Sequence, residues 1–274
     1  MGILKKLTEE YFGDTIREED LIDIHDLNVE IVSFTDNNGK NHKRGYKPED
    51  RDTLKELLER MIKMRGDEGD FNDIDTSKIE DMSFLFTNKT TFNGDISGWD
   101  VSNVKDMEGM FSSATSFNQD ISKWKFPNVE NMSYMFCDAE SFNQDISKWE
   151  FPEVINMESM FEDATSFNQP IGDWKFPNVI TMCSMFNGAT SFNQPIGNWK
   201  FPNVKYMSSM FEGATSFNQP IGNWEFPNVK IMESMFKDAT SFNQDISNWN
   251  IKNVDASNMF KDCPIKDEFK PKMK

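Results

Sequence analysis

The sequence predicts a repeat solenoid, in which 25-residue coils stack on one another behind an N-terminal α/β cap. Tryptophan recurs seven times at intervals of 25 residues, and a Phe-Asn pair recurs seven times at the same interval. A fixed period of roughly 20–50 residues is typical of chains whose units pack only on their neighbours. The tryptophans are Trp99, Trp124, Trp149, Trp174, Trp199, Trp224 and Trp249.

Residues 1–45 are not repetitive and predict a helix followed by a hairpin. The apolar residues over 8–24 have helical spacing. Residues 29–34 alternate as in a strand, and residues 37–40, Asn-Asn-Gly-Lys, form a turn signal. An alternating run followed by such a turn favours a β-hairpin.

Residues 46–70 predict a helix that caps the repeats. Pro48 and Asp50 are typical of a helix start, and Gly66 and Gly69 are typical of a helix end. The first coil would otherwise expose its aromatic face to water, so we expect this helix to cover it. The apolar stripe of the helix consists of Leu54, Leu57, Leu58, Met61, Ile62 and Met64.

The repeats occupy residues 71–264 in about eight coils, and residues 265–274 form a tail. In each coil the pattern Val-x-x-Met-x-x-Met-Phe has steps of three and four residues, which predict a short helix or 3₁₀ turn. The pattern Ile-x-x-Trp, flanked by Pro, Gly and Asn, predicts a short strand. We expect the apolar positions to be buried. In one coil these are Phe117, Ile121, Trp124, Val129, Met132, Met135, Phe136 and Ala139.

Asparagine follows the first phenylalanine of every copy, from Asn72 to Asn243. We expect these side chains to form a ladder, in which each amide binds backbone groups at a bend and links one coil to the next. The alternative interpretation is a row of polar groups that bind a ligand.

The repeated run Asn-Val-x-x-Met-x-x-Met-Phe-x-x-Ala-x-Ser-Phe-Asn-Gln-x-Ile-x-x-Trp resembles the BspA-type leucine-rich repeats of bacterial surface proteins. It is most similar to the variant catalogued as a domain of unknown function in mycoplasmas and other AT-rich microbes. The resemblance covers residues 71–263, and residues 46–57 look like the helical leader that often precedes these repeats. It implies a leucine-rich-repeat solenoid, a right-handed coil, protein binding and often adhesion, with no catalytic residues.

The net charge of −17 predicts repulsion from nucleic acid and from anionic membranes. Solubility alone explains this charge, and a protein partner with a basic surface is the alternative explanation. No apolar run reaches the length of a transmembrane helix, so we expect no membrane insertion. The first ten residues lack the apolar stretch of a signal peptide, which predicts a cytoplasmic protein. The family resemblance keeps the cell surface as the alternative.

Catalytic groups are scarce, and we expect no enzyme activity, no cofactor and no metal. The two histidines, His25 and His42, lie outside the repeats. Three cysteines in different repeat columns predict free thiols rather than a disulfide framework or a metal cluster. A calcium site at a recurring aspartate column, which includes Asp120, is disfavoured because one carboxylate per coil is too few. The tryptophan column has the spacing of a core, which favours burial over carbohydrate binding.

Surface columns that vary between copies are the candidates for recognition. Concave faces bind partners in other solenoids, so we expect the face formed by Ile-x-x-Trp to bind the partner. The candidate residues are Asp120, Lys123, Lys125, Asp145, Lys148, Glu150, Asp173, Lys175, Asn198, Lys200, Asn223 and Glu225. A second candidate is an apolar stripe of Ile155, Ile180, Tyr206 and Ile231, for which local packing between coils is the other interpretation.

These observations predict a non-enzymatic protein-binding scaffold that works inside the cell and uses the variable polar face of the repeats. A surface or virion-associated adhesin is the first alternative. The second is a targeting arm for an effector segment within residues 1–70. The sequence leaves the oligomeric state open.

Overall fold

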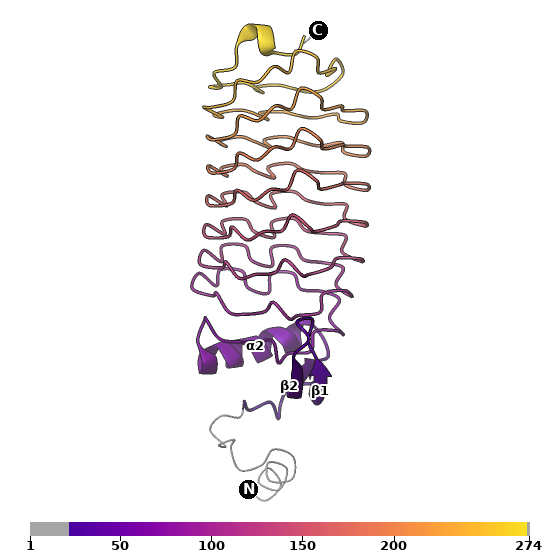
Figure 1. The fold of residues 1–274 in the computed structure, drawn as a ribbon, viewed down its shortest axis with the longest axis vertical. Coiled ribbons are helices and arrows are strands. Elements are labelled where there is room, and N and C mark those ends of the chain that lie inside the picture. The colour runs from indigo at the N-terminus through magenta and orange to yellow at the C-terminus, as the bar shows by residue number, and fades with distance from the viewer. Residues whose placement is uncertain (1–21, 273–274) are drawn as a thin grey trace, which may run out of the picture.

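The computed structural model describes residues 22–272. Strands β1 (Val29–Thr35) and β2 (Asn41–Pro48) pair as an antiparallel hairpin and are followed by helix α2 (Arg51–Arg65). The hairpin and the helix lie at one end of a stack of repeats, and the 3₁₀ helix η2 (Asp267–Phe269) lies at the other end (Figure 1). The helix expected over 8–24 falls almost entirely outside the described residues.

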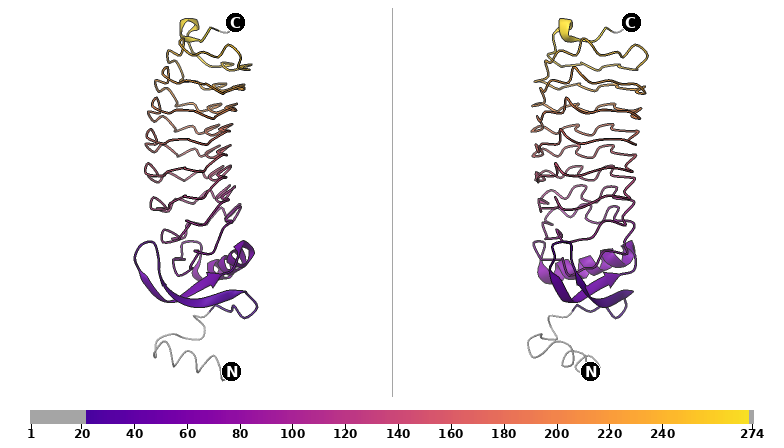
Figure 2. Two further views of the ribbon diagram at one scale, coloured as in Figure 1. Left: turned by 90° about the vertical axis from the view of Figure 1, so that its right-hand side faces the viewer. Right: turned by 45° about the vertical axis from the view of Figure 1, so that its right-hand side comes forward.

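Helix α2 covers the first repeat (Figure 2). The side chain of Asp50 caps its start by accepting a hydrogen bond from the backbone amide of Thr53 at 2.9 Å. At its end, Gly66 has a φ of 79°, a conformation that costs glycine little. The helix residues Leu54, Leu57, Leu58 and Met61 are buried in one cluster with the rings of the first repeats.

Strand β2 continues through Tyr46 to Pro48 and is joined directly to the stack. Tyr46 forms a parallel bridge with Ile74, and its backbone amide donates to the carbonyl of Asp73 at 2.8 Å. The hairpin is therefore joined to the first repeat by backbone hydrogen bonds, whereas the pairing that recurs between repeats begins at Asp81 and Asp106.

Each repeat consists of turns and extended segments. Among the described residues of the repeats, we find no helix and no strand longer than an isolated bridge. The expected short strand at Ile-x-x-Trp and the expected short helix are therefore wrong. The Ile-x-x-Trp segment is instead closed into a turn, in which the amide of Trp149 donates to the carbonyl of Ile146. In the methionine segment, left-handed backbone at positions such as Ser159 (φ 53°) and Asp163 (φ 52°) interrupts a regular helix. Single turns closed by i→i+3 hydrogen bonds do occur in the methionine segment, as from Met135 to Met132, but they do not continue into a 3₁₀ helix.

Backbone pairing between repeats follows the Val-x-x-Met-x-x-Met-Phe segment, which we call the ladder side. Every second amide of this segment donates to a carbonyl of the next repeat, and the amides between them close turns within their own repeat. Isolated parallel bridges join successive repeats at the residue before the first methionine. In one pair of repeats the donors are Met132, Tyr134, Phe136 and Asp138, and the acceptors are Asn156, Glu158, Met160 and Glu162.

The expected core columns are buried. In these columns, the Phe, Trp, Met and Ile side chains of the central repeats are at most 4% exposed, and the phenylalanine rings stack on the equivalent rings of neighbouring repeats. The predicted asparagine ladder is confirmed. The backbone amide of Asn143 donates to the side-chain oxygen Oδ1 of Asn118 at 2.9 Å. Gln144 Nε2 donates to the backbone carbonyl of Asn118 at 2.8 Å.

The repeats are spaced more widely away from the ladder side. Ring centroids are 5.5 Å apart for Phe136 and Phe161 on the ladder side. They are 6.5 Å apart for Phe126 and Phe151, in the segment that follows tryptophan. The close spacing therefore lies on the ladder side, and not at the Ile-x-x-Trp segment where we expected paired strands.

Candidate binding surface

The segment from the residue before tryptophan to the following proline forms a second surface, which we call the groove side. In one repeat it reads Lys148-Trp149-Glu150-Phe151-Pro152. Trp149 and Phe151 are buried, whereas the other three residues are exposed. This alternation follows from an extended backbone, which turns successive side chains to opposite sides. Each repeat thus shows two polar side chains around a buried indole.

Side chains rather than backbone pairs connect successive repeats on the groove side. The indole Nε1 of Trp174 donates to the carbonyl of Ile146 in the preceding repeat at 3.1 Å. The ring of Phe151 meets that indole edge to face, with centroids 4.8 Å apart. Asn178 Nδ2 donates to the carbonyl of Pro152 at 2.6 Å. These contacts hold the repeats at the wider spacing seen here.

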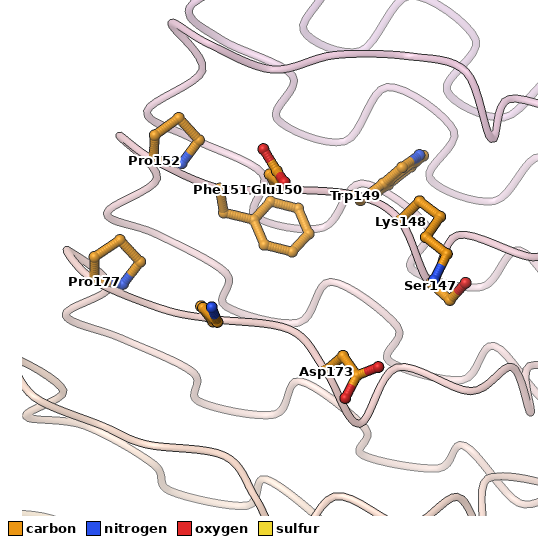
Figure 3. A pocket seen from close by; sticks show the side chains of 9 residues that line it. Ser147, Lys148, Trp149, Glu150, Phe151, Pro152, Asp173 and Pro177 are labelled. Atoms are coloured by element: carbon orange, nitrogen blue, oxygen red, sulfur yellow. The ribbon is translucent and has the colours of Figure 1, made fainter.

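Grooves open between the repeats on this side. A cavity of about 350 Å³ lies between the repeats of Trp149 and Trp174, and Figure 3 shows side chains of both repeats around it. A second cavity, of about 440 Å³, lies between the repeats of Trp174 and Trp199. Six of the predicted residues line the two cavities. They are Lys148, Glu150, Asp173, Lys175, Asn198 and Lys200.

All twelve candidate residues are exposed, and none forms a salt bridge within residues 22–272. Asn223, Glu225 and Lys125 occupy the groove-side columns of other repeats. The carboxylates of Asp120 and Asp145 accept hydrogen bonds from backbone amides two residues later, so they stabilise local turns. The hydrogen bond from the amide of Ser147 lowers the pKa of Asp145. Their contact with a partner remains a prediction.

The first repeat of the groove side is already occupied by the tip of the hairpin. The amide of Asn37 donates to the carbonyl of Gly98 at 3.0 Å, and Asn37 Nδ2 donates to the carbonyl of Trp99 at 2.7 Å. Asn38 Oδ1 accepts a hydrogen bond from Lys123 Nζ in the next repeat at 2.8 Å. Lys123 therefore belongs to an internal contact, in contrast to the equivalent lysine of the following repeat.

Gly98 makes room for this tip. A Cβ atom at Gly98 would lie 2.9 Å from a carboxylate oxygen of Asp36 and 2.9 Å from the amide oxygen of Asn72. Every later copy has a side chain at this position, beginning with Lys123. This contact was not predicted from the sequence. The glycine in a column of larger residues was the available signal.

The later repeats leave backbone groups of the groove side without partners among the described residues. The carbonyls of Lys148 and Trp149 accept no hydrogen bond there, although their equivalents Gly98 and Trp99 accept bonds from the hairpin tip. The same holds for the repeats of Trp124, Trp174, Trp199 and Trp224. Backbone carbonyls are obligatory acceptors, and these lack the partners that the hairpin tip provides in the first repeat.

A family model described as Mycoplasma protein of unknown function, DUF285, matches the chain over residues 54–174 and again over 156–271. The two matches together span both the capping helix and the repeats. The chain belongs to the DUF285 family. No curated protein and no solved structure matches it.

The apolar stripe expected on this DUF285 chain lies on the ladder side and spans two columns. Ile155 and Tyr206 are 44% and 38% exposed, and Ile180 and Ile231 are partly buried. The backbones of Ile155 and Ile180 are hydrogen-bonded to each other, with an N–O distance of 2.8 Å. The backbone of this stripe is therefore part of the internal pairing, unlike the groove side.

Other chemistry in the described part of this DUF285 chain is structural. His42 Nε2 lies 2.8 Å from a carboxylate oxygen of Asp36, and both side chains are buried in the hairpin. Burial, together with nearby carboxylates, raises the pKa of Cys137 to about 12, so this thiol stays protonated at neutral pH. Residues 22–272 contain no cluster of three or more metal-ligating side chains and no helix suited to cross a membrane.

Proposed function

We propose that this DUF285 protein is a non-enzymatic protein-binding scaffold whose groove side holds the partner. We further propose that its repeats form a leucine-rich-repeat-like solenoid of the BspA type, as the sequence resemblance implies. The two matches of the family model support the repeat architecture. The nearest-neighbour hydrogen bonds between repeats are those that a solenoid requires.

The observation that carries the proposal is the pair of neighbouring grooves lined by side chains that change from repeat to repeat. Lys148 and Glu150 in one repeat correspond to Asp173 and Lys175 in the next. The buried Trp and Phe beneath them do not change. A constant framework that displays variable polar groups is the usual arrangement of a repeat protein that binds other proteins.

The charge of the chain supports a partner with a basic surface. With a net charge of −17, the molecule attracts cationic proteins at long range and repels nucleic acid. Five lysines lie in the two groove-side columns between residues 123 and 225, against three carboxylates. The grooves themselves are therefore mixed in charge. Contact with a partner there depends on the arrangement of individual charges rather than on the net charge of the molecule.

A capture experiment tests the proposal. The full-length protein is immobilised, proteins are captured from a lysate of the cells that express it, and the affinity of each identified partner is measured. Reversing the charge at Lys148, Asp173 and Lys200 is expected to weaken binding of a true partner by about tenfold or more, because each lost charge contact contributes up to about 1 kcal/mol. Reversal at Lys230 and Glu233, exposed on the ladder side, is the matched control.

Binding that survives the groove-side reversal, or that the ladder-side reversal abolishes instead, excludes the groove side as the partner surface. A surface or virion-associated adhesin is the second proposal, favoured by the resemblance to surface proteins. Protease treatment of intact cells separates the two, since an external protein is digested and an internal one is protected. The targeting-arm proposal is disfavoured because β2 and the hairpin tip are bonded to the stack.

A further inference from the structure

We propose that the groove side binds an extended polypeptide segment that runs along the stack and places asparagine or glutamine side chains at alternate positions. This inference rests on the proposed function and names the form of the ligand. It follows from three observations: the hairpin tip bound in the first repeat, the unpaired carbonyls of the later repeats, and the spacing between repeats on this side.

The hairpin tip shows how an amide side chain fits the surface. Asn37 Nδ2 donates to the carbonyl of Trp99 at 2.7 Å. Asn38 Oδ1 accepts from Lys123 Nζ at 2.8 Å, and Asn38 Nδ2 donates to Ser97 Oγ at 2.8 Å. A carboxamide has both a donor and an acceptor, and the surface needs both. The backbone carbonyls of the surface accept a hydrogen bond from the carboxamide NH₂ group, and the lysine ammonium groups donate to the carboxamide oxygen.

The same two kinds of group continue along the stack beyond the hairpin. The carbonyls of Trp149 and Trp174 accept no hydrogen bond from the described residues; that of Trp199 accepts none either, but Trp199 is fully buried. A lysine stands beside each of these tryptophans. Lys148 precedes Trp149 in the column of Lys123, whereas Lys175 and Lys200 follow their tryptophans on the same exposed face. None of the three forms a salt bridge within residues 22–272. The surface bound by the hairpin is thus continuous with the open repeats.

The spacing selects an extended ligand parallel to the stack. Neighbouring rings on the groove side are 6.2 Å apart for Trp199 and Trp224, and 6.4 Å apart for Phe151 and Phe176. Two residues of an extended chain span about 6.4–6.8 Å. Every second side chain of an extended segment therefore meets an equivalent position of the next repeat. A helix rises only about 1.5 Å per residue and does not match this period.

Three seven-residue peptides with blocked ends test the inference against the full-length protein. The first alternates asparagine and threonine, beginning and ending with asparagine. The second has the same composition with the four asparagines in one block. The third replaces the asparagines of the first by aspartate, which has no donor at neutral pH. Dissociation constants are measured by titration calorimetry or by fluorescence anisotropy of labelled peptides.

We expect the alternating asparagine peptide to bind at least about tenfold more tightly than the block isomer and about fivefold more tightly than the aspartate peptide. The variant with Lys148→Glu, Lys175→Glu and Lys200→Glu is expected to weaken binding of the first peptide by about tenfold. The ladder-side variant with Lys205→Glu and Lys230→Glu is expected to leave it unchanged. Circular dichroism confirms that both variants fold.

Equal affinity of the alternating and block peptides, including no detectable binding of either, would overturn the extended-segment inference. Equal or tighter binding of the aspartate peptide would overturn the requirement for an amide donor. Either result leaves the scaffold proposal standing if an identified protein partner still loses affinity on groove-side charge reversal. If the peptide result fails and the partner's affinity is also unchanged by groove-side charge reversal, the groove side is excluded as the binding surface.

Discussion

The ladder side and the groove side of each repeat connect to the next repeat by different means. On the ladder side, backbone amides such as that of Tyr134 donate directly to carbonyls of the next repeat. On the groove side, an indole, a phenyl ring and an asparagine make the connection, and the rings lie farther apart. Internal pairing therefore occupies the backbone of one surface of the repeats, whereas the side-chain contacts leave carbonyls of the other surface without partners among the described residues.

The largest effect on the free energy of unfolding is expected from substitution of Phe161, whose ring contacts residues of both sides. Phe161 is fully buried and stacks on Phe136 and Phe186 of the ladder side, and it also contacts Trp174. Phe161→Ala should lower the free energy of unfolding by about 3–5 kcal/mol, because it leaves a cavity in a close-packed column. Urea unfolding followed by tryptophan fluorescence measures the loss.

Ser166→Ala is the control for this change, since Ser166 is exposed. It should alter the free energy of unfolding by less than about 0.5 kcal/mol. A loss below about 1 kcal/mol for Phe161→Ala would contradict the view that the ring columns join the two sides.

The next largest loss of stability is expected from substitutions at the left-handed positions of the ladder side. Ser184 has a φ of 55°, which a β-branched side chain opposes strongly. Ser184→Val should cost about 1–3 kcal/mol of unfolding free energy. Ser184→Gly is the matched variant and should stay within about 1 kcal/mol of the parent, because glycine accepts this backbone. Equal stability of the two variants would show that the turn can be rebuilt without the left-handed residue.

A smaller difference is expected between two tryptophans of the groove side. The indole Nε1 of Trp174 donates to the carbonyl of Ile146, whereas that of Trp124 is buried without a hydrogen-bond partner among the described residues. Trp174→Phe should therefore lose about 1 kcal/mol more unfolding free energy than Trp124→Phe. Thermal unfolding of both variants measures this difference. A larger loss for Trp124→Phe would reverse the assigned role of the indole bond.

The smallest effect is expected at Glu162 on the ladder side. Burial raises the pKa of Glu162, with nearby Asp163, Asp138 and Glu158 adding to the shift. An acid with a raised pKa in the folded state is penalised when charged, so its contribution to stability improves as the pH falls through that pKa. Glu162→Gln should raise the free energy of unfolding at pH 7 by less than about 1 kcal/mol.

This gain should disappear at a pH below the folded pKa, where Glu162 is already protonated. Urea unfolding of the parent and the variant at neutral and acidic pH gives the comparison. A gain that persists unchanged in acid would point to packing rather than charge as its origin.

The period of the sequence was sufficient to predict the buried columns and the asparagine ladder. Burial of Trp149 or Phe142 requires only that equivalent residues stack, and the 25-residue spacing contains that information. The paired segment was not predictable from apolar positions, because Ser159 and Asp163 reveal no left-handed backbone by their type. Glycine at the same positions in other copies, at Gly109, Gly188 and Gly213, and asparagine at Asn88 and Asn258 were the local indications.

The candidate surface was predictable as a set of columns but not as grooves. Variation between copies pointed to Lys148 and Asp173, whereas the cavity between them depends on the wider spacing of the rings. That spacing results from the distribution of hydrogen bonds over the two sides, which no single residue encodes. The hairpin contact at Gly98 depends in turn on where β1 and β2 lead the chain.

The asparagine ladder has a consequence for the size of the protein. Each of its bonds, such as that from Asn193 to Asn168, reaches only the adjacent unit. One 25-residue module could therefore be deleted or duplicated in the middle without changing any contact at the two ends. The number of modules would then set the length of the groove side without altering either end of the molecule.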